Sequence, residues 1–424
     1  GRVLSMRSFG KLRFFDLLEN GAKIQASARK GETPEAVLET LADVDVGDFV
    51  RVEGPVWRTR TGELTVDAKK VELLAKSLRP LPEKWHGLAD VEARFRQRYL
   101  DLLVNEDARE AFLARSRIVA ALRRRLDAEG FVEVETPILQ PRYGGAFATP
   151  FTTHHNELDQ DFYLRIADEL YLKRLIVGGF EKVYEIGKDF RNEGVSTKHQ
   201  PEFTMLEWYE AYADYRDTMA RIEDCVRFAA REALGTTKVS FRGHEVDFGP
   251  DWQRLSFVES LERIELWTRD EAELRAWLDE RRVDTRQDTT WAHLVDHAFS
   301  HFVEPELIEP TIVHDYPVEL SPFARTTDGD PAFTERFEYF VGGMELGNAY
   351  TEINEPDEQA ARFAEQARVV GGVQGDPDYV EALAYGMPPT GGLGLGIDRL
   401  AMVFTGRETI RDVILFPALR ERKS

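Results

Sequence analysis

The sequence predicts an α+β protein with a small N-terminal β-barrel and a larger domain in which helices flank an antiparallel sheet. Short strand-like stretches fill the chain from residue 3 to about 74, a proline-containing segment follows, and helical periodicity alternates with strands beyond it. A length of 424 residues exceeds what one hydrophobic core usually supports. Two folding units are therefore expected.

The composition describes a soluble globular protein, since 42% of residues are hydrophobic and 31% are charged. No apolar stretch approaches the length of a membrane span, so a membrane role is not expected. The single cysteine, Cys225, excludes a disulfide framework within the chain and a cysteine-based zinc cluster. It suits a reducing cytoplasm, where we expect the protein to reside.

The net charge of -21 repels nucleic acid on average, so such a partner would have to meet locally basic surfaces. The chain opens at Gly1 with neither an initiator methionine nor a signal peptide. We expect its first domain to be N-terminally truncated.

The first domain is expected to span residues 1–76. Strand-like stretches at 12–17, 23–26, 48–54 and 63–66 are separated by turn residues, and a helical piece lies near 36–41. This pattern fits a five-stranded Greek-key barrel of the OB type, which binds oligonucleotides. On this segment alone, a barrel without a ligand is an equal alternative.

Prolines at positions 80 and 82 predict an extended linker over 77–86, followed by a second domain at 87–424. Helical spacing at 110–128 leads to Gly130, which is suited to end a helix, and 131–137 alternates like a strand. The charged, motif-poor stretch at about 217–313 is interpreted as an appended helical insertion.

The segment 184–209 carries a concentrated set of polar and aromatic residues. A strand, a loop and a second strand would place Arg191 at the end of the first strand and Phe203, Glu207 and Tyr209 on the second. An arginine fork can hold two anions in line, and an aromatic face with a polar group such as Glu193 can bind an adenine. A charged hairpin with Arg191 in a surface ion pair is the alternative interpretation.

The glycine-rich segment 391–400 predicts a strand that leads into a helix near Asp398, with Arg399 in its first turn. A dinucleotide-binding fingerprint is a poor alternative, because a convincing βαβ frame and a later acidic residue are missing.

The helix at 110–128 with 130–137, the segment 184–209 and the segment 391–400 resemble, in this order, motifs one, two and three of class II aminoacyl-tRNA synthetases. The resemblance covers nearly the whole chain and points to the lysine, aspartate and asparagine subgroup. It implies activation of an amino acid with ATP, transfer to tRNA, and a homodimer built on motif one.

The resemblance also implies roles for individual residues. Arg191 would bind the substrate carboxylate and the α-phosphate, and with Arg399 it is a candidate catalytic residue. Phe203 and Arg399 would sandwich the adenine, and His199 would reach the outer phosphates. Glu338 and Glu345 resemble the pair that holds Mg²⁺ against ATP, an ion that favours a few carboxylates with phosphate oxygens.

Carboxylates at the amino-acid pocket favour the lysine-specific branch. Three glutamates match its substrate-binding positions, and a buried ammonium needs such partners. Glu207, Glu352 and Tyr209 would bind the side-chain ammonium, and Glu169 with the backbone of Gly145 would bind the α-amine. Asn348 would assist Arg191. An aspartate pocket would need a cation at these positions.

The resemblance extends to a substrate loop at 143–151 and to the barrel. In the barrel, Phe14 and Gln25 match positions that stack on and hydrogen-bond the central anticodon uridine, and Arg7 and Glu63 are further candidates on the same surface. For Phe14 alone a core position is favoured, because Phe14 and Phe15 face opposite sides.

The prediction is therefore a lysine-specific enzyme that takes ATP, L-lysine and tRNA-Lys. The nearest alternatives are an aspartate- or asparagine-specific relative and a paralogue that lysylates a protein, although such paralogues lack the barrel. An inactive RNA-binding relative would be expected to have lost Arg191, Arg399 or the acidic pair.

Overall fold

A computed structural model of the chain describes residues 1–81, 88, 90–146, 148–321, 323–370 and 375–421. Its contacts divide the chain into two compact units, Gly1–Asn105 and Glu106–Ser424. The first contains the barrel with helices α2 (Val91–Arg96) and α3 (Arg98–Val104). The predicted linker at 77–86 runs partly outside the described residues, so this boundary stays a prediction.

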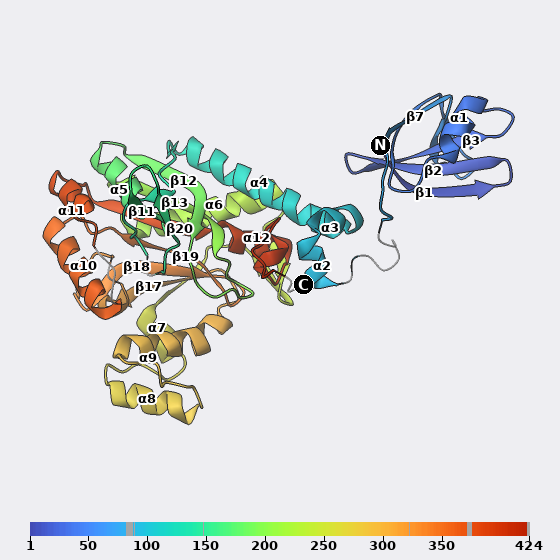
Figure 1. The fold of residues 1–424 in the computed structure, drawn as a ribbon. Helices are drawn as coiled ribbons and strands as arrows, with labels where there is room; N and C mark the ends of the chain where they lie inside the picture. The colour runs from blue at the N-terminus through green and yellow to red at the C-terminus, as the bar shows by residue number, and fades with distance from the viewer. Residues whose placement is uncertain (82–87, 89, 147, 322, 371–374, 422–424) are drawn as a thin grey trace. The chain divides into compact units, whose positions relative to one another are not determined.

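The N-terminal barrel is one mixed sheet with the strand order β5-β6-β3-β2-β1-β4-β7 (Figure 1). Its core gathers apolar side chains such as Val3, Phe15 and Leu41. The elements are β1 (Arg2–Phe9), β2 (Leu12–Glu19), β3 (Ala22–Arg29), α1 (Glu35–Ala42), β4 (Phe49–Glu53), β5 (Val56–Arg58), β6 (Leu64–Asp67) and β7 (Lys70–Ala75).

Seven strands are present where the sequence predicted five. Strands β1, β5 and β7 match none of the stretches predicted at 12–17, 23–26, 48–54 and 63–66; all three residues of β5 are exposed, and only Val71 of β7 is buried. Both β5 and β7 lie at the edges of the sheet, where a strand is covered on fewer sides.

The larger unit is built on an eight-stranded sheet with the order β16-β17-β18-β19-β20-β13-β12-β8 (Figure 1). Its pairs are antiparallel from β17 to β12, and the outermost pairs on both sides are parallel. The strands are β8 (Val132–Glu133), β12 (Lys182–Phe190), β13 (Glu202–Ala211), β16 (Gln253–Ser256), β17 (Thr311–Pro317), β18 (Phe333–Phe340), β19 (Glu345–Thr351) and β20 (Thr390–Gly396).

Helices α4 (Glu106–Ala128), α6 (Tyr215–Leu234) and α12 (Ile397–Thr405) pack on one face of this sheet. Gly130 follows α4 with a φ of 83°, as expected for a helix-ending glycine. Trp208 of β13 is fully buried in this core, with its ring centroid 6.1 Å from that of Phe131. Because side chains alternate along a strand, Glu207 and Tyr209 lie on the opposite face.

The stretch 217–313 is not one appended insertion. Helix α6 lies in the core of the domain and is followed by a hairpin of β14 (Lys238–Phe241) and β15 (His244–Asp247), and then by β16 of the main sheet. Helices α7 (Phe257–Glu262), α8 (Glu271–Glu280) and α9 (Trp291–Ala298) gather around a second core, to which β16, β17 and β18 of the main sheet also contribute. The sequence predicted that this stretch is helical, but it could not show which elements of the domain pack against α6.

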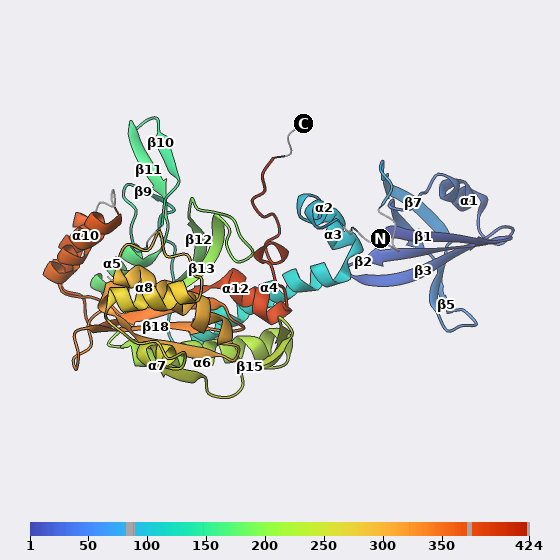
Figure 2. The same ribbon diagram turned by 90° about the horizontal axis from the view of Figure 1, so that it is seen from below.

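The second face of the sheet is bordered by α5 (Glu169–Val177), α10 (Pro356–Val370) and α11 (Pro377–Ala384). Strands β9 (Leu139–Gln140), β10 (Thr152–His155) and β11 (Gln160–Leu164) form a small sheet that extends away from it (Figure 2). No helix in the described part of the chain is long and apolar enough to cross a membrane.

Candidate active site

Two cavities adjoin on the face of the large sheet opposite α4 and α6. The first measures about 300 Å³ and the second about 250 Å³. Both are lined by Arg191, which directly follows β12, and by Asn348 of β19. Arg191 and Asn348 come from strands that are separated by β20 and β13, and they meet where two ligand parts could be held side by side.

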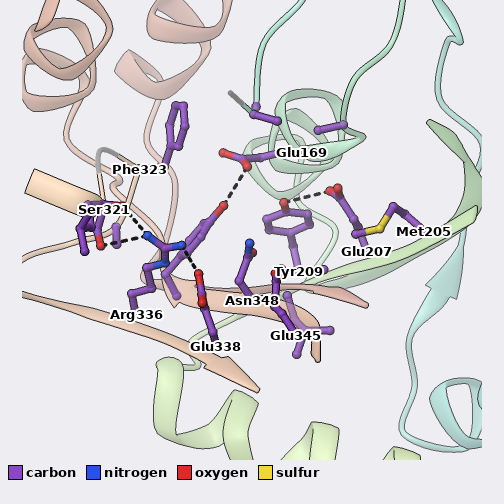
Figure 3. A pocket seen from close by; sticks show the side chains of 18 of the residues that line it. Glu169, Met205, Glu207, Tyr209, Ser321, Phe323, Arg336, Glu338, Glu345 and Asn348 are labelled. Carbon is purple, nitrogen blue, oxygen red and sulfur yellow. Dashed lines mark hydrogen bonds and ion pairs between the residues drawn. The ribbon is translucent and has the colours of Figure 1, made fainter. Parts of the chain in front are cut away.

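The first cavity is rich in carboxylates. It is lined by Glu169 at the start of α5, by Glu207 and Tyr209 of β13, and by Gly145. The Tyr209 hydroxyl donates a hydrogen bond to Glu207 at 3.2 Å, which Figure 3 shows on the cavity wall. Burial raises the pKa of the Glu207 carboxyl well above its ordinary value, and Asp189 and Glu169 raise it further. A cation bound in this cavity would stabilise the ionised form of Glu207.

Glu352 is fully buried but does not line the cavity among the described residues. Its carboxylate forms an ion pair with Lys173, whose ammonium also donates to Glu169 at 2.7 Å. A Cβ at Gly392 would lie 2.0 Å from Oε1 of Glu352 and 2.5 Å from a ring carbon of Tyr209. Only glycine at this position leaves room for both side chains.

The second cavity combines an aromatic ring with cationic groups. Phe203 lies 5.1 Å from the Arg191 guanidinium, measured to the ring centroid, and Arg399 lines the same space from the first turn of α12. The Arg399 guanidinium lies 3.1 Å from Nε2 of His199, whose pKa is lowered by burial and by Arg399. Glu193 completes the lining as an exposed residue of the loop.

The helix that carries Arg399 begins as the sequence predicted. Strand β20 ends at Gly396, and α12 starts at the next residue. Asp398 in the first turn accepts a hydrogen bond from the Thr204 backbone N–H and another from Arg115 of α4, both at 2.7 Å. These contacts fix the helix start against β13, so Arg399 is held at the second cavity.

Glu338 and Glu345 both line the first cavity, and Glu345 also lines the second. Each is paired with an arginine: Glu338 with Arg336 at 2.5 Å, and Glu345 with Arg399 at 2.9 Å (Figure 3 shows the first pair). Burial raises the pKa of Glu338 to about 7, against the opposing effect of Arg336. Burial would also raise the pKa of Glu345, but Arg399 together with Arg336 and Arg191 outweighs burial, so the pKa is lowered.

Comparison with known proteins matches residues 90–420 to the class II tRNA synthetases (D, K and N) and residues 1–74 to an OB-fold nucleic acid binding domain. The chain belongs to the class II tRNA synthetases of the D, K and N group. It is 51% identical to a lysine–tRNA ligase of Dehalococcoides mccartyi, over 100% of this chain and 87% of the relative. Lysine–tRNA ligases of Pelotomaculum thermopropionicum and Clostridium tetani are 49% and 50% identical, over 100% and 99% of this chain and 86% of each relative.

The OB domain of this synthetase brings three of its four predicted residues, Arg7, Phe14 and Gln25, onto one face of the barrel together with Asp16. Arg7 pairs directly with Phe14, and Gln25 pairs directly with Asp16, so the alternation of strands places all four on the same side. Phe15 is buried and Phe14 is not, which excludes Phe14 from the core.

Polar contacts fix two of these side chains. Thr65 donates to the Gln25 side-chain oxygen at 3.0 Å, and Arg7 contacts Asp16 at 3.0 Å. Glu63 is exposed just before β6, two residues from Thr65. The face therefore offers an aromatic ring flanked by hydrogen-bonding groups, as a single-stranded nucleic acid requires.

The sequence analysis of this synthetase missed three residues of the site: Arg336, Tyr350 and Lys173. Arg336 lies two positions before Glu338, and Tyr350 lies between Asn348 and Glu352 at the same spacing, so strand alternation could have placed both. Lys173 follows Glu169 by one helical turn. Within the predicted loop at 143–151, Gly145 lines the first cavity with a φ of 84°, and residue 147 lies outside the described part.

Proposed function

We propose that this synthetase is a lysine–tRNA ligase: it activates L-lysine with ATP and transfers the lysyl group to the 3′-terminal adenosine of tRNA-Lys. The observation that carries the proposal is the position of Arg191 between a carboxylate-lined cavity and a cavity with an aromatic ring. The first suits an amino acid with a cationic side chain, and the second suits the adenine nucleotide. The names of the relatives support the same substrate.

The first step joins the two substrates at Arg191. The lysine carboxylate attacks the α-phosphorus of ATP, an oxygen–phosphorus bond forms, and pyrophosphate leaves with the electrons of the broken bond. The Arg191 fork holds both anions together, which reduces their repulsion and aligns them. Asn348 lines both cavities beside it and orients the carboxylate.

In the second step a hydroxyl of the terminal adenosine attacks the carbonyl carbon of the lysyl-adenylate. The ester bond forms, AMP leaves, and the hydroxyl proton is released.

ATP is bound in the nucleotide cavity before the first step. There, Phe203 and Arg399 bind the two faces of the adenine, Glu193 reads its edge and His199 contacts the outer phosphates.

Glu338 and Glu345 fit an ion that is bound together with ATP. Mg²⁺ uses one or two carboxylates with phosphate oxygens and water, and these two carboxylates line the cavity that contains Arg191. Within the described residues no group of three or more His, Cys, Asp or Glu side chains could hold a metal by itself. Such an ion would neutralise phosphate charge when it is bound.

The barrel face with Phe14, Gln25, Arg7 and Glu63 is the proposed anticodon-binding surface. We further propose a homodimer, on the basis of the first motif in α4 and β8, and a cytoplasmic location, with which the buried unpaired Cys225 is compatible. A protein-lysylating activity is the weaker alternative, because residues 1–74 match a nucleic acid binding domain.

Amino-acid-dependent exchange of pyrophosphate into ATP tests the substrate directly. Lysine should support exchange, while aspartate and asparagine should not, and tRNA-Lys should then accept the lysyl group. Exchange with aspartate or asparagine alone would refute the lysine assignment. Lysine-dependent exchange without aminoacylation of tRNA-Lys would leave activation intact and refute the transfer step.

A further inference from the structure

A buried cluster of charged side chains lies next to residues of the amino-acid cavity and has no part in the proposed reaction. It consists of one arginine and three carboxyl groups, each 6% exposed or less: Arg165, Asp168, Glu185 and Asp189. None of the four lines either cavity among the described residues. Burying charges is costly unless each has a partner, so the partners indicate what the cluster does.

Arg165 and Glu185 are well supplied with hydrogen-bond partners. The Arg165 guanidinium donates to Glu185 at 2.6 Å and to the carbonyl oxygen of Lys188 at 2.9 Å. Glu185 also accepts from the backbone N–H and the hydroxyl of Thr136, at 3.0 Å and 2.7 Å. A Cβ at Gly187 would lie 1.9 Å from a terminal nitrogen of Arg165, so glycine at this position makes room for the guanidinium.

Asp168 and Asp189 lie beside the same guanidinium but receive no hydrogen bond from it. Their Oδ1 atoms are 2.9 Å and 3.3 Å from Nε of Arg165, whose hydrogen is donated to the carbonyl oxygen of Lys188. None of their four carboxyl oxygens accepts a hydrogen bond from an N–H or hydroxyl group in the part of the chain that the structure describes. Both side chains are 0% exposed, so bulk water does not supply a donor either.

A proton shared by the two carboxyl groups resolves this arrangement. A protonated carboxyl group has an O–H donor, and its hydrogen bond to a carboxylate is short and strong. Burial raises the pKa of Asp168 well above its ordinary value, and Asp189 raises it further. Burial also raises the pKa of Asp189, to about 6, and the side chain of Asp168 is its hydrogen-bond partner. At neutral pH the pair therefore holds one proton.

The charged groups around the pair come from three strands and the residues that follow them. They are Arg165 directly after β11, Glu185 of β12, Arg191 directly after β12 and Glu207 of β13. Next to burial, the two arginines lower the pKa of Asp189, while Glu185 raises it. Glu207 and Glu185 raise the pKa of Asp168, while Arg165 lowers it. These charges oppose one another, so burial decides that a proton is retained.

Asp168 is the N-cap residue of α5, but its side chain does not cap the helix. An aspartate at this position usually accepts a hydrogen bond from the N–H of the second or third helical residue. This side chain makes no such bond and instead contacts Arg165 and Asp189. Its orientation is therefore determined by the pair and not by the helix.

The two aspartates join the segments that carry Glu169 and Arg191. Asp168 directly precedes Glu169, the first residue of α5, and Asp189 lies two residues before Arg191. The Arg191 guanidinium also donates to the carbonyl oxygen of Ile166 at 3.3 Å, so the two segments lie side by side. The proposed ligands of Glu169 and Arg191 are the α-amine and the carboxylate of one amino acid. Both groups are attached to the same carbon, so the spacing of the two side chains must be kept.

We propose that Asp168 and Asp189 share one proton and act as a positioning pair that holds Glu169 and Arg191 at the spacing of an amino acid's α-amine and carboxylate. Without that proton, two buried carboxylates would repel each other and move the start of α5 away from the end of β12. The inference rests on the proposed function for the identity of the two ligands. The shared proton itself belongs to the protein and is present without substrate.

Infrared difference spectroscopy of the full chain at neutral pH tests the shared proton. The unmodified protein should show the C=O stretching band of a protonated carboxyl group that is missing from Asp168→Asn and from Asp189→Asn. In each variant the asparagine amide donates to the remaining carboxylate, so no proton is needed. The double variant Asp168→Asn/Asp189→Asn should lose no more of this band than either single variant. A twofold larger loss in the double variant would show two separate protons, and no loss in any variant would show none; either result would overturn the inference.

Lysine-dependent pyrophosphate exchange tests the positioning role. Asp168→Asn keeps a donor in the place of the shared proton, so the KM for lysine and kcat should stay within about threefold of the unmodified enzyme. Asp168→Ala leaves the Asp189 carboxyl group buried without a donor, so it should raise the KM for lysine about tenfold or more and lower kcat. Asp251→Ala, at an aspartate that is 98% exposed, is the matched control.

The outcomes separate this inference from the proposed function. Equal impairment of Asp168→Asn and Asp168→Ala would show that a carboxyl group is required there, and an unimpaired Asp168→Ala would show that the pair positions nothing. Should Asp168→Ala not fold, the infrared comparison and the kinetics of the two asparagine variants carry the test. Failure of the unmodified enzyme to use lysine would refute the proposed function, while the infrared result would still decide whether the proton is shared.

Discussion

The Tyr209 hydroxyl donates to the Glu207 carboxylate at 3.2 Å, from two positions along the same strand, β13. The hydrogen bond orients the one cavity carboxylate that lacks a cation among the described residues. Tyr209→Phe should therefore raise the KM for lysine about 10- to 100-fold, since hydrogen bonds to charged groups contribute about 1.5–3 kcal/mol. Steady-state exchange kinetics measure this effect, and an equal rise in the KM for ATP would contradict it.

Arg399 should affect the nucleotide and not the amino acid. Its guanidinium lines the second cavity and contacts Glu345 at 2.9 Å, so Arg399→Ala removes both an adenine contact and the partner of the Glu345 carboxylate. We expect the KM for ATP to rise at least about tenfold with little change in the KM for lysine. Arg407→Ala is a matched control, because Arg407 contacts Asp107 and lines neither cavity in the described structure. Equal changes for both substrates would argue against the division of roles.

Phe14 should contribute to tRNA use without affecting amino-acid activation. Stacking of a base on an aromatic ring contributes roughly 1–3 kcal/mol, so Phe14→Ala should raise the KM for tRNA by about 5- to 150-fold. Pyrophosphate exchange should not change, since the barrel and the two cavities lie in separate compact units. Tyr385→Ala, at an exposed tyrosine of the larger unit, is the control. Unchanged aminoacylation by the Phe14 variant would exclude the proposed face.

Glu338→Gln should specifically weaken the binding of Mg²⁺. The substitution keeps the size of the side chain and removes one of two carboxylates at the proposed ion site. We expect the Mg²⁺ concentration for half-maximal exchange to rise about tenfold while the KM for lysine is retained. Glu335→Gln, on the opposite face of β18, is the control. An unchanged Mg²⁺ titration would place the ion elsewhere.

Asp189 gives a dependence of stability on pH. Burial raises its pKa from 3.8 to about 6, so the folded protein holds a proton that the unfolded chain releases. This contribution to stability is complete below about pH 4 and is lost as the pH rises through about 6, with a limit of about 3 kcal/mol. Denaturant unfolding of both proteins should be measured from pH 4 to pH 7. Over this range, the free energy of unfolding of Asp189→Asn relative to that of the unmodified protein should increase by up to about 3 kcal/mol. If the stabilities of the two proteins changed with pH in the same way, the raised pKa of Asp189 would be contradicted.

Local patterns predicted much of the site. The alternation along β13 separated Trp208, which is buried in the core, from Glu207 and Tyr209, which line the cavity. The glycine-rich segment correctly gave the strand that leads into α12. These predictions succeeded because each depends on a pattern within one short segment of the sequence.

The remainder depends on contacts between distant segments. Glu352 was expected to line the amino-acid cavity, but its ion pair with Lys173 joins residues 179 positions apart and no local pattern contains it. Helix α6 was assigned to an insertion for the same reason: the charged, motif-poor stretch that contains it gave no sign that α4 and the main sheet pack against it. The roles assigned to individual site residues remain predictions that the variants above can test.

Gly392 limits how this pocket can be redesigned. Because any side chain there would collide with both Tyr209 and Glu352, a library meant to recode the enzyme for other amino acids gains nothing by varying this position alone. Even alanine would force the Glu352 carboxylate to shift and would disturb its partnership with Lys173. New substrate shapes are better sought at Phe323 and Ala324, which line the cavity from outside the strands of the central sheet.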